Sequence, residues 1–143
     1  MDIDDVYEAL AAAVNTAAID INGQRLNATA FAPDALSTPH FFPAEFVGSY
    51  EKTFNGLAEL VITGRLMLSR ADDLSGQQMA QRLAGTGEST IRAAIRSARG
   101  APGQAALSGA ADDIHLQRVQ GPRIYEIGQA SFYGLEFTIF VMG

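Results

Sequence analysis

The sequence predicts a single α+β domain with a mainly antiparallel sheet and helices packed on one of its faces. Three observations predict this class. Apolar residues near the amino terminus repeat at helical spacing, apolar and polar residues near the carboxyl terminus alternate strictly, and the strand patterns occur in clusters instead of alternating with helices. The chain has 143 residues, of which 48% are hydrophobic and 18% charged. That composition suits one folded domain, residues 1–143, with its own core.

The expected order of elements is one helix, three strands, two helices and three strands. Residues 3–17 carry the helical repeat, and aspartates at its start favour the positive end of the helix dipole. Short strands are expected at residues 25–32 and 41–48, and Pro43 confines the second to an edge or to its beginning.

The longest strand pattern follows residue 56 and has one apolar and one polar face. We expect the apolar face to be core and the polar face to meet water or a neighbouring subunit. The apolar face carries Leu60, Ile62, Leu66 and Leu68, and the polar face carries Glu59, Thr63, Arg65 and Ser69.

Two helices and three strands complete the expected order. The first helix ends near Ala84, and the second is expected from Thr86, as its cap, to Ala98. A loop of small residues fills 100–109. The last strands are expected at residues 114–119, 123–127 and 131–142, and the buried side of the second helix at Ile91, Ala94, Ile95 and Ala98.

Composition narrows the function classes. The absence of cysteine excludes disulfides, thiolate metal sites and a cysteine nucleophile. The net charge of −6 disfavours binding to a nucleic-acid backbone, although it would suit a surface over which DNA slides. The acidic start is unlike a signal peptide and the apolar runs are short, so we expect a soluble chain without a membrane partner.

We expect no enzyme, no cofactor and no metal. The acidic pairs at 72–73 and 112–113 and the two histidines match no metal-binding spacing. Residues 85–90 resemble a phosphate loop, but they lack its lysine and its preceding strand. A serine or threonine nucleophile could use only His40 or His115 as its base, and no nucleophile elbow is present.

Arg92, Arg96 and Arg99 fall on one face of the second of these helices, opposite Ile91 and Ile95. Two interpretations remain open: a solvated face with local salt bridges, or a contact to acidic residues of a neighbouring subunit. Arginine suits the second because its planar head group forms bidentate pairs at interfaces.

In order along the chain, several segments resemble the tail terminator proteins, also called tail completion proteins, of long-tailed actinobacterial phages. The likeness covers residues 50–142 well and the first helix loosely, and its strength lies in the order and spacing of the segments. They are Tyr50-Glu51-Lys52-Thr53-Phe54-Asn55-Gly56-Leu57-Ala58-Glu59-Leu60, Leu68-Ser69-Arg70-Ala71-Asp72-Asp73, Leu83-Ala84-Gly85-Thr86-Gly87, Ser89-Thr90-Ile91-Arg92-Ala93-Ala94-Ile95, Tyr125-Glu126-Ile127-Gly128 and Tyr133-Gly134-Leu135-Glu136-Phe137.

The resemblance implies a virion protein at the junction of tail and neck, assembled in the host cytoplasm. Its expected partners are the major tail tube protein, the head-to-tail connector and other copies of itself, in a ring that the family implies to be a hexamer, with DNA passing through the ring. We expect the contacts to involve Arg92, Arg96, Arg99, Arg65, Glu59, Tyr50 and Phe54. Two alternatives stay open: a connector or stopper protein, and a small ligand-binding or hydrolytic domain using His115 and Asp113.

Overall fold

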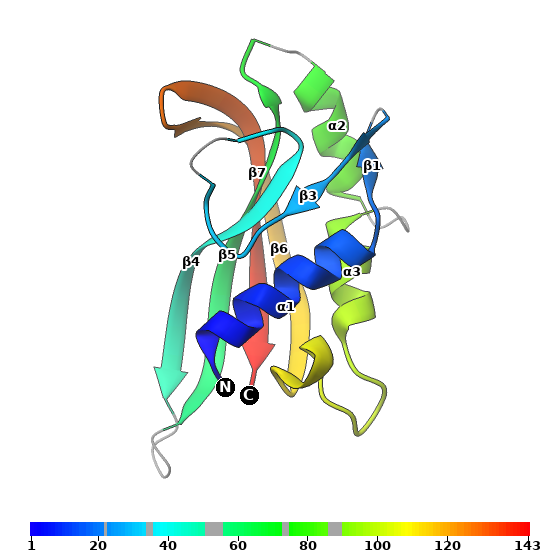
Figure 1. Ribbon diagram of the computed structural model, residues 1–143, viewed down its shortest axis with the longest axis vertical. Coiled ribbons are helices and arrows are strands. Elements are labelled where there is room, and N and C mark those ends of the chain that lie inside the picture. Colours follow the sequence, from blue (N-terminus) through cyan, green and yellow to red (C-terminus); the bar gives the residue numbers. More distant parts are fainter. Residues whose placement is uncertain (22, 34–35, 51–55, 73–74, 86–89) are drawn as a thin grey trace.

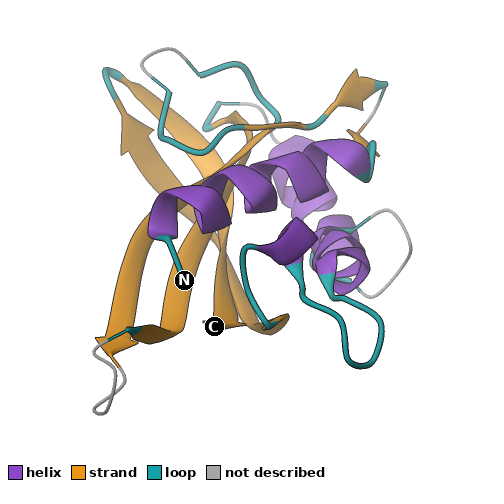
Figure 2. Ribbon diagram, turned by 60° about the horizontal axis from the view of Figure 1, so that its bottom comes forward, coloured by secondary structure: helices purple, strands orange, loops and turns teal. Residues whose placement is uncertain are grey.

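The computed structural model confirms the α+β class (Figure 1). It describes residues 1–21, 23–33, 36–50, 56–72, 75–85 and 90–143. A five-stranded sheet in the order β3-β4-β5-β7-β6 forms one layer, and the helices pack on one of its faces (Figure 2).

The order of the elements matches the expected one closely. Two short strands, β1 and β2, form a separate small hairpin after the first helix. The elements are α1 (Ile3–Thr16), β1 (Asp20–Ile21), β2 (Gln24–Arg25), β3 (Asn27–Ala28), β4 (His40–Tyr50), β5 (Leu57–Arg70), α2 (Ser75–Leu83), α3 (Ile91–Ala98), a 3₁₀ turn (Leu107–Gly109), β6 (Asp113–Ile127) and β7 (Ala130–Met142).

Helix α1 begins where the sequence predicts. The carboxylate of Asp2 caps it by accepting hydrogen bonds from the backbone N–H groups of Asp4 and Asp5, at 2.9 and 3.3 Å. Val6 and Leu10 on its inner face are fully buried. Asn15, near its end, bonds both backbone groups of Ala28 at 2.9 Å and so ties α1 to β3.

Strand β4 lies at the edge of the sheet over most of its length. Strand β3 pairs with it in parallel only at His40 and Phe41, whereas β5 pairs with it along its whole length. Pro43 therefore lies beyond the end of β3, on an outer edge where its missing N–H removes no hydrogen bond of the ladder. The predicted edge position of Pro43 is confirmed.

The main core lies between the helices and the sheet. Leu60, Ile62 and Leu66 of β5 are fully buried, and they pair across the strands with alternate residues of β7. Because directly opposed residues point to the same face, the apolar alternation in both strands gives one continuous buried surface.

A β-bulge after Met67 overturns one predicted orientation. Met67 pairs with Gly134 and Ser69 with Tyr133, so β5 has one extra residue, Leu68, at this point. The extra residue shifts the alternation by one position. Ser69 therefore lies on the helix side, beside Gly76 of α2, and the prediction of a polar outer face at Ser69 is wrong.

The face of the sheet away from the helices is not entirely polar either. Met67, Phe42 and Phe132 form a second, smaller buried cluster there. The expectation that this face meets only water or a subunit is therefore wrong at this end of the sheet.

Helix α3 begins later than predicted. Thr90, not Thr86, is its cap, and the Thr90 hydroxyl accepts a hydrogen bond from the N–H of Ala93 at 3.2 Å. Thr86 lies outside the described residues. Ile91, Ala94 and Ile95 are buried as predicted, while Ala98 is only partly buried.

Strand β6 is one continuous strand where the sequence pattern predicts two, at residues 114–119 and 123–127. Gly121 and Pro122 were expected between two strands, but β6 continues past them with a shift of register between Gln120 and Arg123. The preceding loop is anchored in the core, because Ala106 and Leu107 are buried.

Candidate functional site

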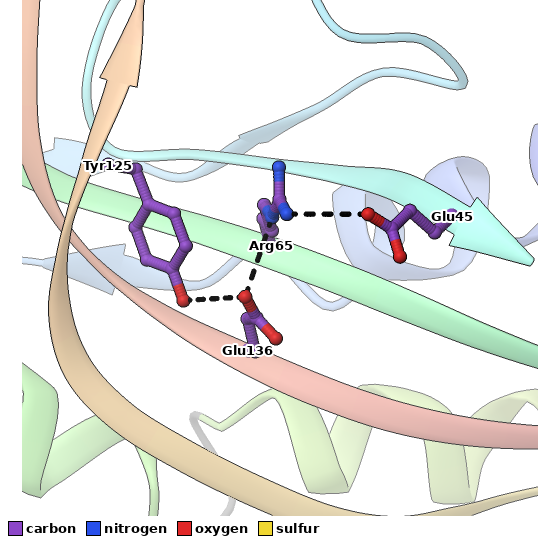
Figure 3. Close-up of polar contacts among 4 residues, drawn as sticks. All are labelled: Glu45, Arg65, Tyr125 and Glu136. Carbon is purple, nitrogen blue, oxygen red and sulfur yellow. Dashed lines mark hydrogen bonds and ion pairs between the residues drawn. The ribbon is translucent and has the colours of Figure 1, made fainter.

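An ion-pair network lies on the sheet face away from the helices, with Arg65 at its centre. The Arg65 Nε atom lies 3.6 Å from Glu136 Oε1, and its Nη2 atom lies 3.7 Å from Glu45 Oε1 (Figure 3). Arg65 belongs to β5, Glu45 to β4 and Glu136 to β7. The register places these three side chains together, since Arg65 is paired directly with Glu136.

Tyr125 of β6 completes the network. Its hydroxyl donates a hydrogen bond of 2.9 Å to Glu136 Oε1, and the Arg65 guanidinium lies 5.2 Å from the centre of its ring. Burial, together with the hydrogen bond to Glu136, raises the pKa of Tyr125 to about 12. The phenol is therefore protonated at neutral pH and acts as a donor.

This network joins the four long strands of the sheet. Arg65 was expected to contact a partner, but its charge is already opposed by Glu136, whose side chain is only 14% exposed. The arrangement can hold β4, β5, β7 and β6 in register, and we assign it a structural role. Nothing in the sequence pattern joined Tyr125, Glu45 and Glu136 to Arg65, because their pairing depends on strand register.

A second polar cluster lies between α3 and β6. Arg92, Arg96, Arg99 and His115 line a hollow of about 160 Å³. Ile95 and Leu116 form its apolar part. The structure thus brings the three predicted arginines together and adds His115, whose ring lies 5.2 Å from that of Phe140.

Arg99 differs from the other two arginines because it is held within the chain. Its Nε and Nη2 atoms donate to the two carboxylate oxygens of Asp113, at 2.9 and 3.2 Å. This bidentate bond lowers the pKa of the Asp113 carboxyl. Arg92 and Arg96 are exposed and make no ion pair with any described residue.

Both oxygens of the Asp113 carboxylate therefore already accept hydrogen bonds from Arg99. In the described part of the chain, no hydrogen bond links Asp113 to His115. The pair does not have the geometry of an acid that orients a histidine base.

The outer half of β4 carries exposed apolar side chains on both faces of the strand. Phe46 is 50% exposed, and Val47 and Tyr50 are each 69% exposed. Tyr50 and Glu59 were both expected at an interface, and both are exposed on this β4–β5 hairpin. Phe54 lies outside the described residues.

His40 is a buried group that the sequence placed in a loop. It begins β4, is 5% exposed, and its Nε2 lies 2.8 Å from the hydroxyl of Thr29. That hydroxyl donates to the carbonyl of Phe31, so it accepts from His40 Nε2. Burial lowers the pKa of His40, and no described residue forms a hydrogen bond with its Nδ1.

A wide groove runs between α1, α3 and the 3₁₀ turn. Its volume is about 940 Å³, and small residues line most of it, with Asp5 and Glu8 among its few charged residues. No pattern in the sequence predicts this groove, because it depends on how α1, α3 and the 3₁₀ turn pack against one another.

Within the described ranges, no three histidine or acidic side chains are grouped so that they could hold a metal ion. No described helix combines the length and hydropathy needed to span a membrane.

Searches against protein-family models, curated proteins and solved structures find no match to this chain.

Proposed function

We propose that this protein is a structural subunit of a phage tail, of the terminator type. In this proposal, copies assemble into a ring at the head-proximal end of the tail tube, stop its polymerisation and join the tail to the head-to-tail connector. The observation that carries the proposal is the outer half of β4, where an unpaired strand edge and exposed aromatic and aliphatic side chains coincide.

An unpaired strand edge is a ready site for contacts with another chain. In the described structure β5 is the only strand beside residues 45–50 of β4, so the other edge of this segment carries no strand. Native proteins usually protect such edges or use them in assembly. Phe46, Val47 and Tyr50 add exposed apolar side chains along this segment, on both faces of the strand, and exposed apolar surface is typical of interaction sites.

The location of this edge also supports an assembly role. The paired ends of β4 and β5 lie at the same end of the molecule as the start of α1 (Figure 1). A contact there could reach a neighbouring subunit or the tube without disturbing the core. The network around Arg65 would keep the hairpin in register while it makes such contacts.

The proposal names three kinds of partner and one place. The partners are other copies of this chain, the major tail tube protein and the connector, and DNA passes through the ring without specific binding. The net charge of −6 suits such passage, since phosphates would not adhere to an acidic lumen. The place is the tail-neck junction of the virion, reached after assembly in the host cytoplasm.

Electron microscopy of tail tubes tests the proposal directly. Purified tubes incubated with this protein should carry a ring at one end and should stop growing when tube protein is added. A connector protein would instead bind the portal end of filled heads. A protein that binds neither particle and stays monomeric would contradict both.

A pair of variants tests whether the β4 edge is the contact. Val47→Asp combined with Tyr50→Asp should abolish binding to tubes, because two charges would enter an apolar contact. Ile124→Asp is the matched control: Ile124 is 59% exposed but lies on β6, at the opposite edge of the sheet. Equal loss of binding in both variants would contradict a contact through β4.

A further inference from the structure

We propose that Arg92 and Arg96 of one copy pair with Asp4 and Glu8 of the next copy. This contact rests on the proposed ring, because it requires neighbouring copies of the same chain. It assigns the exposed cations of α3 to one partner, the acidic first turns of α1.

Arg92 and Arg96 form the positively charged side of the contact, at the hollow between α3 and β6. Arg92 and Arg96 line the hollow between α3 and β6, and no described acid neutralises them. Arg99, at the same hollow, already has the Asp113 carboxylate as its partner. Among the described residues, the hollow therefore carries two positive charges that no acid opposes, beside the apolar side chains of Ile95 and Leu116, against which the methylene groups of an acidic side chain could pack.

The acidic side lies on the outer face of α1. Asp4, Asp5 and Glu8 are exposed, whereas Val6, Tyr7 and Leu10 of the same turns face the core. Asp4, Asp5 and Glu8 make no ion pair within the described structure. Asp2 is excluded from the contact because its carboxylate caps the helix.

The spacing of the two sets of charges agrees. Asp4 and Glu8 are four residues apart on α1, and Arg92 and Arg96 are four residues apart on α3. Residues at this spacing lie one above the other on a helix, with Cβ atoms about 5–6 Å apart. When α1 of one copy lies along α3 of another, both ion pairs can form at once.

The two surfaces lie on different parts of the molecule. The start of α1 and helix α3 are separated across the helical layer in both views (Figures 1 and 2). A contact between two different surfaces repeats from copy to copy and closes into a ring when the rotation allows. It also offsets locally the repulsion between subunits that each carry a net charge of −6.

Charge reversal on each side tests the contact by analytical ultracentrifugation. Arg92→Glu with Arg96→Glu should raise the concentration for half-assembly at least about tenfold, and so should Asp4→Lys with Glu8→Lys. Circular dichroism should show that both double variants stay folded. Arg118→Glu with Arg123→Glu is the matched control, since it makes the same charge change at exposed positions of β6 and should leave assembly unchanged.

Mixing provides the decisive measurement. Each double variant keeps one intact surface, and its reversed surface is complementary to the reversed surface of the other variant. An equimolar mixture should therefore assemble into species in which the two variants alternate, whereas neither variant assembles alone. The quadruple variant, with both surfaces reversed, should assemble again. Rings that survive either double variant, or a mixture that does not co-assemble while the quadruple variant stays monomeric, would overturn the contact and leave the ring proposal standing. A wild-type chain that forms no ring, alone or on tail tubes, would overturn the ring and the contact together.

Discussion

Arg65 and the arginines of α3 were all expected at a subunit contact, yet the structure places them in two different environments. Arg65 faces Glu136, Glu45 and Tyr125 within its own sheet, and its side chain is 31% exposed. Arg92 and Arg96 project from a helix face where the described structure offers them no acid. An arginine is available to another chain only when its own fold has left its charge unopposed.

The largest loss of stability should come from a substitution on the buried side of α3. Ile95→Ala should lower the free energy of unfolding by about 2–4 kcal/mol, because it leaves a cavity where Ile95 is 1% exposed. Urea denaturation measures the change. Arg96→Ala, on the next position of the same helix, is the control and should change stability by less than about 0.5 kcal/mol. Equal losses would contradict the assignment of the two faces.

Removing the charge of Arg65 should have the next largest effect. Arg65→Met should cost about 1–2 kcal/mol, because Glu136 would keep a largely buried carboxylate without its cation. Thermal and urea unfolding measure the loss. Arg118→Met removes an exposed arginine of the same sheet and should cost almost nothing. The double variant Arg65→Met with Glu136→Gln should recover part of the loss, and additive losses would argue against the pairing.

His40 predicts a dependence of stability on pH. Burial lowers its pKa in the folded protein, so below its ordinary pKa of 6.5 the unfolded chain binds more protons than the folded one. The free energy of unfolding should therefore fall as the pH is lowered from 6.5 toward the depressed folded value. His40→Gln should reduce this slope in urea denaturation series. Identical slopes in the two proteins would show that His40 does not contribute.

The smallest effect should come from the Arg99–Asp113 pair. Its side chains are 51% and 36% exposed, and exposed pairs contribute only about 0–1 kcal/mol. Arg99→Gln should instead be seen by NMR as a rise in the pKa of Asp113, because the lost hydrogen bond is the main cause of its depression. The small stability contribution of the pair should begin to fall as the pH drops below 3.8, the ordinary pKa of the carboxyl, and should be lost as the pH passes through the lower pKa of Asp113 in the folded protein. An unchanged Asp113 titration would contradict the bidentate geometry.

The fold could be predicted where a repeat in the sequence is uninterrupted. Helix α1 and strand β7 follow apolar patterns that run over their whole length, and both lie where expected. Strand β5 shows where such reasoning fails. A single extra residue at Leu68 moves Ser69 to the other face, and no local property of the sequence marks that residue.

The candidate sites could be predicted only in part, for a related reason. Arg92 and Arg96 share α3, so their common face follows from spacing alone. The prediction that Arg99 continues this helix face is wrong, because α3 ends at Ala98 and the backbone of Arg99 is extended. The network around Arg65 draws on β4, β6 and β7, and therefore depends on the register of three strand pairs. The capture of Arg99 by Asp113 depends likewise on how α3 packs against β6.

The bulge at Leu68 has a consequence for how this sequence can change over generations. It brings Ser69 against Gly76 so closely that a methyl group at Gly76 would collide with the Ser69 hydroxyl and would also lie 3.3 Å from the Cβ of Tyr133. Any side chain at Gly76 would push α2 away from the sheet unless the residue opposite became smaller. Descendants of this sequence should therefore keep glycine at 76 wherever 69 keeps serine, and a larger residue at 76 should occur only together with a smaller one at 69.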